Sequence, residues 1–411
     1  MKRYSEYKDS GVKWIGEIPG HWNAVSLKRV VKLINEKSNE QNIPYIALEN
    51  IESFTGKILP LNEIEPDSIC NKFKKDDVLF CKLRPYLTKC VSPSFDGKCT
   101  SELLVLRNFN GVANYLKYTL LSPRLVMDIN ASTYGAKMPR ANWNYIGLCR
   151  VPLPPLPEQE AIVTYLDTKV AKIDEYISIA EKKIAALEEL KQTIITEAVT
   201  RGIHKDVPMK DSGVKWIGMI PEHWKVNKIR SHFKERRVKV SDKDFQALSV
   251  AKIGIVPQLE DACKTDNGDN RKQVLKGDFV VNSRSDRKGS CGISPLDGSV
   301  SLINIVLRPF NILQEYVHYL FRSHNYIEEF YRNGRGIVAD LWTTRYSEMR
   351  NIQIPVPPLY EQQEIVTYLD SKVANINQLC QAERSQIEKL KEYKQRLISD
   401  VVTGKVKVTN D

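Results

Sequence analysis

The chain repeats itself. Residues 8–16 read KDSGVKWIG, and the same letters return at residues 210–218 of a 411-residue chain. A second block, EQEAIVTYLD from Glu158, returns as EQQEIVTYLD from Glu361. Two long copies indicate a duplicated half with pseudo-twofold symmetry, whereas a solenoid needs several short repeats. We therefore expect two similar halves that divide near residue 203.

Charge and cysteine usage limit the partner and the compartment. The sequence has 61 Lys and Arg against 50 Asp and Glu, a formal net charge of +11. This excess favours a polyanionic partner, because clustered cations release counterions condensed on nucleic acid; on charge alone, ribosome or membrane-surface binding stays open. The eight cysteines form no CxxC pair, which favours reduced thiols in the cytoplasm over a zinc site. We expect neither secretion nor a membrane span, since an apolar leader and a run of 18 apolar residues are both missing.

Each half has the same layout. A leading segment with tryptophans and a proline turn, residues 1–22 in the first copy, is typical of an irregular packing clasp. Short apolar runs between turn signals follow, and they predict a mixed α/β domain. The first half has predicted strands at 78–80 and 103–107 and a helix at 113–123 that is stopped by Pro123. The second has strands at 279–282 and 303–309 and a helix at about 314–333.

A proline-rich strap then leads into a long helix in each half, after VPLPPLPEQ at 151–159 and IPVPPLYEQ at 354–362. Apolar residues step by four and three, as in a heptad coiled coil. A helix over about 158–200 would be ~65 Å long, and a globular part of about 130 residues offers too short a face to cover it. Because the second helix must return the chain, we predict an antiparallel pair and a C-terminus close to the N-terminus.

The predicted seam keeps one register in both copies, with a lysine at the same interior position, Lys191 and Lys394. Its other members are Leu166, Val170, Ile173, Ile177, Ala180, Ile184, Leu187 and Ile194 in the first helix, and Leu369, Val373, Ile376, Cys380, Glu383, Ile387, Leu390 and Leu397 in the second.

The predicted fold class is α+β, with two mixed α/β domains joined by two long antiparallel coiled-coil helices in pseudo-twofold, nearly circular symmetry. The predicted boundaries are 1–155 for the first domain, 156–202 for the central helix, 203–357 for the second domain, and 358–411 for the C-terminal helix and tail. Residues 23–150 and 225–350 share little, although the frame around them is repeated. A symmetric frame with two unlike domains, in a basic protein, favours a ruler that reads two different DNA segments.

The repeated KDSGVKWIGEIPGHW and VPLPPLPEQEAIVTYLD patterns resemble the specificity subunits of type I restriction-modification enzymes, over essentially the whole chain. The resemblance implies a noncatalytic, cytoplasmic subunit with two target recognition domains, each reading half of a split, asymmetric DNA target, and helices that set the spacer. It also implies two modification subunits and two restriction subunits as partners. S-adenosylmethionine, ATP and Mg²⁺ would be used by those partners, and this chain would hold no cofactor or metal.

Candidate DNA contacts gather in two turn-rich stretches of each half, where cations, amides and aromatic rings occur together. The residues are Lys82, Arg84, Tyr86, Lys89, Tyr134, Lys137, Arg140, Asn142 and Trp143 in the first half, and Asn282, Arg284, Arg287, Lys288, Arg332, Asn333, Arg335, Thr344 and Arg345 in the second. Surface charge or an internal salt bridge is the alternative for each of them. Arg107 and Arg308, which end apolar strands, are predicted to be structural.

The sequence contains patterns similar to nuclease and nucleotide-binding motifs, but neither supports such a site. Asp67 with Asp96 and Lys98 fits a nuclease pattern only superficially, because Asp-Gly between strands is the signature of a hairpin. A GxGxxA run at 334–339 follows a helix where a nucleotide-binding loop would follow a strand. Neither an NPPY methyltransferase motif nor a phosphate-binding P-loop occurs, so no catalytic residue is predicted.

Two other classes of function stay open. A coiled-coil scaffold could join two protein partners without binding DNA, and its charge would then be incidental. A self-contained restriction endonuclease is the other alternative, against which the missing catalytic motifs argue. The repeated YLD turns near the straps, at 165–167 and 368–370, are candidate anchors for partner subunits on either the DNA-binding or the scaffold interpretation.

Overall fold

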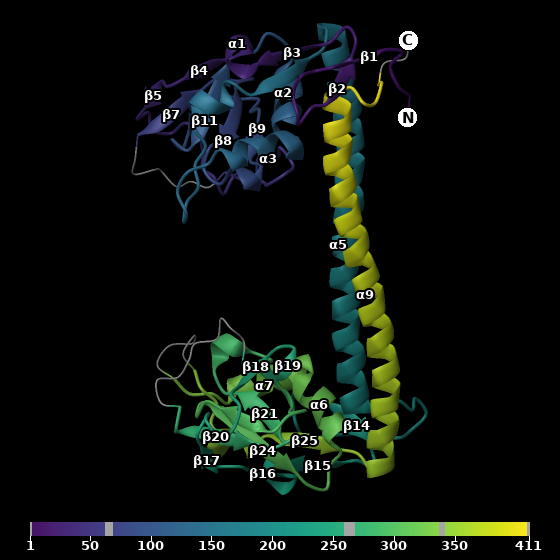
Figure 1. Ribbon diagram of the computed structural model, residues 1–411. Helices are drawn as coiled ribbons and strands as arrows, with labels where there is room; N and C mark the ends of the chain where they lie inside the picture. The colour runs from purple at the N-terminus through teal and green to yellow at the C-terminus, as the bar shows by residue number, and fades with distance from the viewer. Residues whose placement is uncertain (1, 62–68, 259–267, 337–341, 409–411) are drawn as a thin grey trace. The chain divides into compact units, whose positions relative to one another are not determined.

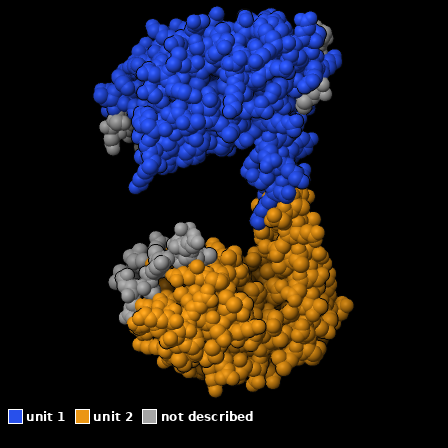
Figure 2. Space-filling view, viewed as in Figure 1, with its two compact units in different colours: residues 1–181, 384–411 blue, residues 182–383 orange. Residues whose placement is uncertain are grey.

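The chain divides into two units of contacting residues, shown in Figure 2. Unit 1 comprises residues 1–181 and 384–411, and unit 2 comprises residues 182–383. The computed structural model describes residues 2–61, 69–258, 268–336 and 342–408. Each unit contains one globular part and a stretch of both long helices, α5 (Leu156–Arg201) and α9 (Leu359–Val402).

Short strands and helices make up the globular part of unit 1 (Figure 1). The strands are β1 (Tyr7–Asp9), β2 (Glu17–Pro19), β3 (Asn23–Ser26), β4 (Lys32–Ile34), β5 (Lys37–Ser38), β6 (Tyr45–Ile46), β7 (Cys70–Phe73), β8 (Val78–Cys81), β9 (Cys90–Val91), β10 (Gly97–Cys99), β11 (Leu103–Arg107) and β12 (Arg150–Leu153). The helices are α1 (Leu27–Val30), α2 (Ala113–Leu120), α3 (Pro123–Ala131), α4 (Trp143–Ile146) and the 3-10 helix η1 (Pro85–Leu87).

Unit 2 has a comparable set of elements in its globular part. The strands are β13 (Met209–Asp211), β14 (Met219–Pro221), β15 (Lys225–Lys228), β16 (Phe233–Glu235), β17 (Lys239–Val240), β18 (Leu248–Ala251), β19 (Gly254–Pro257), β20 (Arg271–Val274), β21 (Phe279–Asn282), β22 (Cys291–Ile293), β23 (Gly298–Val300), β24 (Asn304–Pro309) and β25 (Gln353–Val356). The helices are α6 (Gln314–Arg322), α7 (His324–Arg332), α8 (Tyr346–Met349) and the 3-10 helices η2 (Ile229–Ser231) and η3 (Ser285–Arg287).

Both units are built on the same antiparallel sheet. Its strand order is β4-β11-β8-β9 in unit 1 and β16-β24-β21-β22 in unit 2. All of β8 is buried, because the sheet is covered on both faces. Val78 and Phe80 join the core formed with α2 and α3, while Leu79 and Cys81 join a second core shared with the sheet β5-β7-β10-β6. This alternation follows the two-residue period of a strand.

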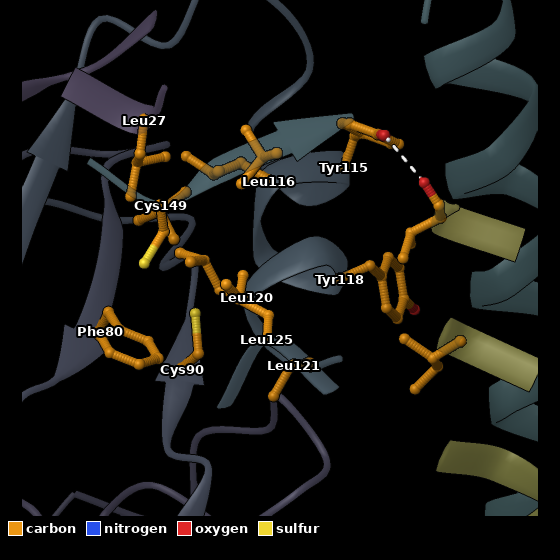
Figure 3. Packing of buried hydrophobic residues seen from close by; sticks show 14 of the residues in the cluster. Leu27, Phe80, Cys90, Tyr115, Leu116, Tyr118, Leu120, Leu121, Leu125 and Cys149 are labelled. Atoms are coloured by element: carbon orange, nitrogen blue, oxygen red, sulfur yellow. Dashed lines mark hydrogen bonds between the residues drawn. The ribbon is translucent and has the colours of Figure 1, made fainter. Parts of the chain in front are cut away.

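The main core of unit 1 lies between this sheet and the short helices. Figure 3 shows Leu120 of α2 on the side of Phe80 and Cys90, while Tyr115 and Tyr118 point from the same helix toward α5 and α9. The helix predicted over 113–123 and stopped by Pro123 corresponds to α2, whereas the helix that follows was not predicted. The structure ends α2 at Leu120 and begins α3 at Pro123, because proline is tolerated in the first turn of a helix. The helix predicted over about 314–333 likewise divides at Ser323 into α6 and α7.

A carboxylate at the start of each long helix fastens the leading segment of its unit. In unit 1 the buried Trp22 donates its indole N–H to Glu158 at 3.0 Å, and His21 Nε2 lies 2.5 Å from the other carboxylate oxygen. Unit 2 repeats this arrangement with Trp224, His223 and Glu361, at 2.8 and 2.5 Å. The two histidines therefore belong to the packing of the leading segments.

In each unit, a buried tyrosine hydroxyl bonds to a backbone carbonyl near the end of a long helix. The buried hydroxyl of Tyr115 lies 2.9 Å from the carbonyl of Pro152 and 3.2 Å from that of Val402 in α9. In unit 2 the Tyr316 hydroxyl reaches Pro355 and Val199 of α5 in the same way.

The chain termini meet within unit 1. Lys2 pairs with Lys407 in an isolated bridge, and the Tyr7 hydroxyl donates to the carbonyl of Gly404 at 3.1 Å. The predicted approach of the C-terminal residues to the N-terminal ones is confirmed in unit 1.

The long helices pack along the predicted seam. In unit 2, Lys183 contacts Glu383 at 2.5 Å and Lys191 contacts Asn377 at 3.1 Å, so numbers rise on α5 while they fall on α9 and the helices are antiparallel. All predicted seam residues are buried or half-buried. The seam also serves a second purpose that the coiled-coil pattern did not predict: Leu166, Val170 and Ile173 join the globular core of unit 1, as Leu369 does in unit 2.

Candidate nucleic-acid interface

The two candidate stretches of unit 1 meet at one backbone junction. Arg84 N donates to the Pro139 carbonyl at 2.7 Å, and Ala141 N donates to the Lys82 carbonyl at 2.9 Å. Arg140 is bridged to Leu83 between these bonds. The end of β8 and the segment before α4 are therefore held side by side, although more than fifty residues separate them in sequence.

Unit 2 forms the same junction with different residues. Ser285 N donates to the Trp342 carbonyl and Thr344 N to the Ser283 carbonyl, each at 2.9 Å. Thr343 is bridged to Arg284 between these bonds, as Arg140 is to Leu83 in unit 1. The structure thus brings together the candidate stretches in both units, and it makes Thr343 the counterpart of Arg140.

Several candidate side chains at the junction of unit 1 face solvent. Tyr86, Tyr134 and Lys137 are exposed, and Lys82 and Arg84 are half-buried. Arg84 has φ +47°, in the left-handed region that an ordinary side chain rarely occupies. Strain of this kind persists only where the surrounding structure holds it, and it concentrates at functional sites.

Other candidates of unit 1 are committed to internal bonds. The Lys89 ammonium donates to the Leu48 carbonyl at 2.6 Å, which favours a structural role. Asn142 accepts a hydrogen bond from Asn144 N and so caps α4, while the adjacent Trp143 is half-buried against the core. Arg140 forms a two-pronged ion pair with Glu102, in which Nη2 lies 2.9 Å from Oε1. The hydrogen bond from Arg140 to Glu102 raises the pKa of the guanidinium.

At the junction of unit 2, acidic side chains accompany the cations. Asp286 lies 3.2 Å from Arg284 and 3.7 Å from Arg287. Lys288 contacts Glu328 at 3.0 Å and lies over the ring of Tyr331. Asn282 accepts a bond from Arg284 N through its side chain, which shapes the start of the loop. These contacts order the cations before any partner arrives.

The C-terminal part of this junction contains exposed arginines. Arg335 is 85 % exposed, with Glu348 at 3.9 Å, and Arg345 is also exposed. Arg332 and Asn333 both contact Glu329, at 3.0 and 3.1 Å. Their availability to DNA would require those bonds to open.

The prediction that Thr344 of unit 2 contacts DNA is corrected, because its side chain is buried. Thr344 is 0 % exposed, and its hydroxyl donates to the Phe330 carbonyl at 3.0 Å. A side chain enclosed in this way supports the junction and does not reach a partner.

The two strand-end arginines also differ. Arg107 donates to buried Asp77 with Nε and Nη2, as predicted for a structural arginine. Arg308 is exposed on β24, so the structure gives it no comparable role.

Sequence reasoning missed Glu102, Asp286 and the partly exposed Trp342, all of which lie at the junctions. Carboxylates that orient an arginine do not themselves carry the donors expected of a DNA contact, so composition does not mark them. Glu102 could have been found as the last residue before the apolar run LLVLR, at the same sheet edge as the end of β8.

Parts of the predicted motifs lie outside the described residues. These parts are Asp67 of the nuclease-like pattern, Cys263, and residues 337–339 of the GxGxxA run. Among the residues that are described, no group of three or more His, Cys, Asp or Glu could hold a metal ion. Within the same ranges, no helix has the length and apolar character needed to cross a membrane.

Comparison with known proteins was made against families, curated sequences and solved structures. The family described as "Type I restriction modification DNA specificity domain" matches residues 225–389, from β15 into α9. The type I restriction enzyme EcoDI specificity subunit of Escherichia coli is 25 % identical over 192 residues, which are 45 % of this chain and 43 % of that protein. The MjaVIII specificity subunit of Methanocaldococcus jannaschii is 26 % identical over 342 residues, which are 76 % of this chain and 75 % of its own length.

A solved structure from work on "complex assembly and conformational transition of the type I R-M system" is similar over most of the chain. It covers 94 % of this chain and 98 % of its own, with a TM-score of 0.71 at 18 % identity. Similarity at that identity concerns the fold alone. It confirms the predicted fold of two mixed α/β domains joined by two long packed helices, and the domains are β-rich with short helices.

Proposed function

This chain belongs to the family of type I restriction-modification specificity subunits, which are noncatalytic, and we propose that its two units each read one half of a split, asymmetric DNA target. The target recognition domains are residues 1–155 and 203–357. The activities of the enzyme reside in the partner subunits, which use S-adenosylmethionine, ATP and Mg²⁺. DNA as the target is consistent with the charge of +11 and with a cytoplasmic location.

One observation supports this proposal more than any other. The backbone junction between the end of a sheet strand and a distant loop is the same in both units, yet the side chains at it differ: Arg140 in unit 1 corresponds to Thr343 in unit 2. A shared backbone with different polar side chains is what two readers of different base sequences need, because base edges are distinguished by hydrogen-bond pattern.

Mapping of methylated adenines tests the function directly. A genome that carries this gene should show a two-part methylated motif, and deletion of the gene should abolish methylation at that motif. The loss is expected because only the specificity subunit reads the sequence. An unchanged methylation pattern after deletion would contradict the proposal and would favour a scaffold that binds no DNA. Cleavage of DNA by the purified chain alone would instead revive the self-contained endonuclease.

We further propose that α5 and α9 set the spacer between the two half-sites. Both helices contribute residues to unit 1 and to unit 2, which makes their length the natural measure of separation. Insertion of four residues at equivalent positions of both helices should lengthen the permitted spacer, while each half-site keeps its sequence. A changed half-site sequence would contradict this role.

The partners are two modification and two restriction subunits in this proposal, and exposed apolar residues on the long helices are the candidate dock for the modification subunits. Asp167 accepts a hydrogen bond from Tyr118 of α2, so this side of α5 faces the recognition domain. Tyr176 is nine residues further along, two and a half turns, and therefore points away from the domain. It is 63 % exposed.

Unit 2 repeats the arrangement on α9. Asp370 accepts a bond from Tyr319 of α6, and the exposed Leu379 lies nine residues beyond it. Tyr176 and Leu379 occupy equivalent positions, one in each unit, which fits two copies of one partner.

A charged substitution at each of these two positions tests whether a modification subunit binds there. Tyr176→Glu and Leu379→Glu should each remove one modification subunit from the complex and together remove both, because burial of an unpaired carboxylate opposes association. The stoichiometry of the purified complex measures this, with Glu175→Ala as a control on the same exposed stretch of helix. Retention of both modification subunits by the double variant would contradict the dock.

A further inference from the structure

The backbone of Arg140 is fixed from two sides. Its N–H and carbonyl exchange hydrogen bonds with Tyr134 at 3.0 and 3.1 Å, which closes the loop 134–140. The bridge to Leu83 and the bond from Ala141 N to Lys82 attach this loop to the end of β8. The Cα of Arg140 therefore has a defined position at the candidate interface.

The side chain of Arg140 is oriented by Glu102. Nε donates to both carboxylate oxygens at 3.2 Å, and Nη2 donates to Oε1 at 2.9 Å. Glu102 is itself held in place, since its carbonyl accepts a bond from Lys82 N at 3.1 Å. Charge-assisted pairs with two parallel bonds are the strongest way to fix a guanidinium in one plane.

One edge of the guanidinium remains available. Arginine has five N–H donors, and Glu102 takes those on the Nε side. The opposite edge, formed by Nη1 and Nη2, has no partner among the residues that the structure describes. The side chain is still 37 % exposed. Two parallel donors on one edge match the O6 and N7 acceptors of guanine in the major groove.

The ion pair is not needed to form the junction. In unit 2 the same backbone bonds form around Thr343, which has no charge. The strand register also places Ile303 at the position of Glu102, because Leu103 pairs with Cys81 as Asn304 pairs with Asn282. Unit 2 thus builds the same backbone with an uncharged pair of residues. A purely structural role for the ion pair of unit 1 leaves this difference without a reason.

We propose that Arg140 reads a guanine in the half-site of unit 1 and that Glu102 is the positioning residue that orients it. This inference rests on the proposed function, and it adds the base class and the residue pair. Glu102 contacts no base in this arrangement. It holds the guanidinium so that the Nη1–Nη2 edge is presented in one orientation.

The experiment uses the complex of this chain with its modification subunits and a DNA library in which each base pair of the target is varied. The wild-type complex should require guanine at one position of one half-site. Arg140→Gln should lose that preference by roughly 10- to 100-fold and gain adenine, because glutamine pairs with adenine N6 and N7. Glu102→Gln should relax discrimination about tenfold at the same base pair and nowhere else. Glu383→Gln, which breaks an ion pair between the long helices, is the matched control and should leave every base preference unchanged.

A modified base tests the contact without altering the protein. The wild-type complex should methylate a target with 7-deazaguanine at that position about as poorly as the Arg140→Gln complex methylates the normal target, since the N7 acceptor is missing. Variants that lower methylation equally on all sequences, or a half-site without an Arg140-dependent guanine, would overturn the inference while leaving the proposed function intact. If no motif depends on this chain at all, the proposed function fails and the inference fails with it.

Discussion

Units 1 and 2 agree where a domain meets the long helices and differ where we place the DNA. Trp22 with Glu158 in one unit corresponds to Trp224 with Glu361 in the other, bond for bond. The loops at the junction share only their backbone pattern. After a duplication, contacts that hold the frame are constrained by packing on all sides, whereas exposed loops can change without disturbing a core.

The contact between the long helices differs between the two units, although it belongs to the repeated frame. In unit 1, Lys394 of α9 donates to Asp174 of α5 at 2.7 Å, and Lys57 of the recognition domain lies 2.7 Å from the same carboxylate. In unit 2 the equivalent lysine, Lys191, contacts the uncharged Asn377 at 3.1 Å. Lys191 also pairs with Glu188 of its own helix. Among the described residues, unit 1 differs in that Lys57 of its recognition domain shares a carboxylate with the seam lysine.

Removal of a seam leucine should have the largest effect on the free energy of unfolding. Leu166 and Leu369 are each fully buried in the core of their own unit. Leu166→Ala and Leu369→Ala should each lower the free energy of unfolding by about 2 to 5 kcal/mol, because a cavity adds to the lost burial. Chemical denaturation measures this, with Met127→Ala and Ile253→Ala as exposed controls that should change it by less than about 0.5 kcal/mol. A loss in only one unit would show that the two cores are not equivalent.

Removal of the carboxylates at the starts of the long helices should have the next largest effect on stability. Glu158→Ala and Glu361→Ala should each cost about 2 to 3 kcal/mol, since a buried indole N–H loses its acceptor. Exposed Glu364 is the control, and Glu364→Ala should cost less than about 1 kcal/mol. Equal losses at Glu158 and Glu364 would contradict the anchoring role.

The anchor of unit 2 should also depend on pH. Burial acts to raise the pKa of Glu361, but hydrogen bonds from Trp224 and His223 outweigh it and lower the pKa from its ordinary value of 4.5. A depressed folded-state pKa means that this stability is complete above pH 4.5 and is lost as pH falls through the folded value. The difference in unfolding free energy between wild type and Glu361→Gln should therefore shrink below pH 4.5. A difference that stays constant with pH would contradict the charged anchor.

The frame could be predicted from the sequence because its signals are periodic and repeated. Seam residues in steps of four and three gave both long helices, and the repeated Trp and Glu marked the places where the anchors form. The stop at Pro123 was predicted, but the helix α3 that begins there was not, because proline can both end one helix and begin another. The pattern carries no information on which of the two occurs.

The junctions could be predicted only in part. Lys82, Arg140 and their neighbours lie in turn-rich stretches, which composition can reveal. Their internal partners cannot be found in that way, since Glu102 meets Arg140, and Lys89 meets Leu48, through tertiary structure alone. The burial of Thr344 has the same origin. Side-chain availability is a property of the folded loop and not of the residue type.

The charged connection of unit 1 should have a smaller effect than the anchors. Asp174→Asn copies unit 2 into unit 1 and should cost about 1 to 3 kcal/mol, because Lys394 is only 5 % exposed and loses its counterion. Asn377→Asp makes the reverse change beside Lys191 and should shift the unfolding free energy by less than about 1 kcal/mol, since Asn377 is exposed. Equal and opposite effects of the two substitutions would contradict the asymmetry.

The smallest effect is expected where the two units agree most closely. Tyr115→Phe and Tyr316→Phe remove one hydroxyl each, between a strap carbonyl and the last turns of a long helix. Each should lower the unfolding free energy by about 1 kcal/mol, the net value of a hydrogen bond that is lost while the ring stays packed. Tyr134→Phe, on an exposed ring, is the control and should cost nothing measurable. Because both hydroxyls bond the same two kinds of carbonyl, the losses should agree within a few tenths of a kcal/mol. A larger loss in unit 1 would mean that the contacts between the two ends of the chain add constraint there. The two units would then differ in stability although their hydrogen bonds match.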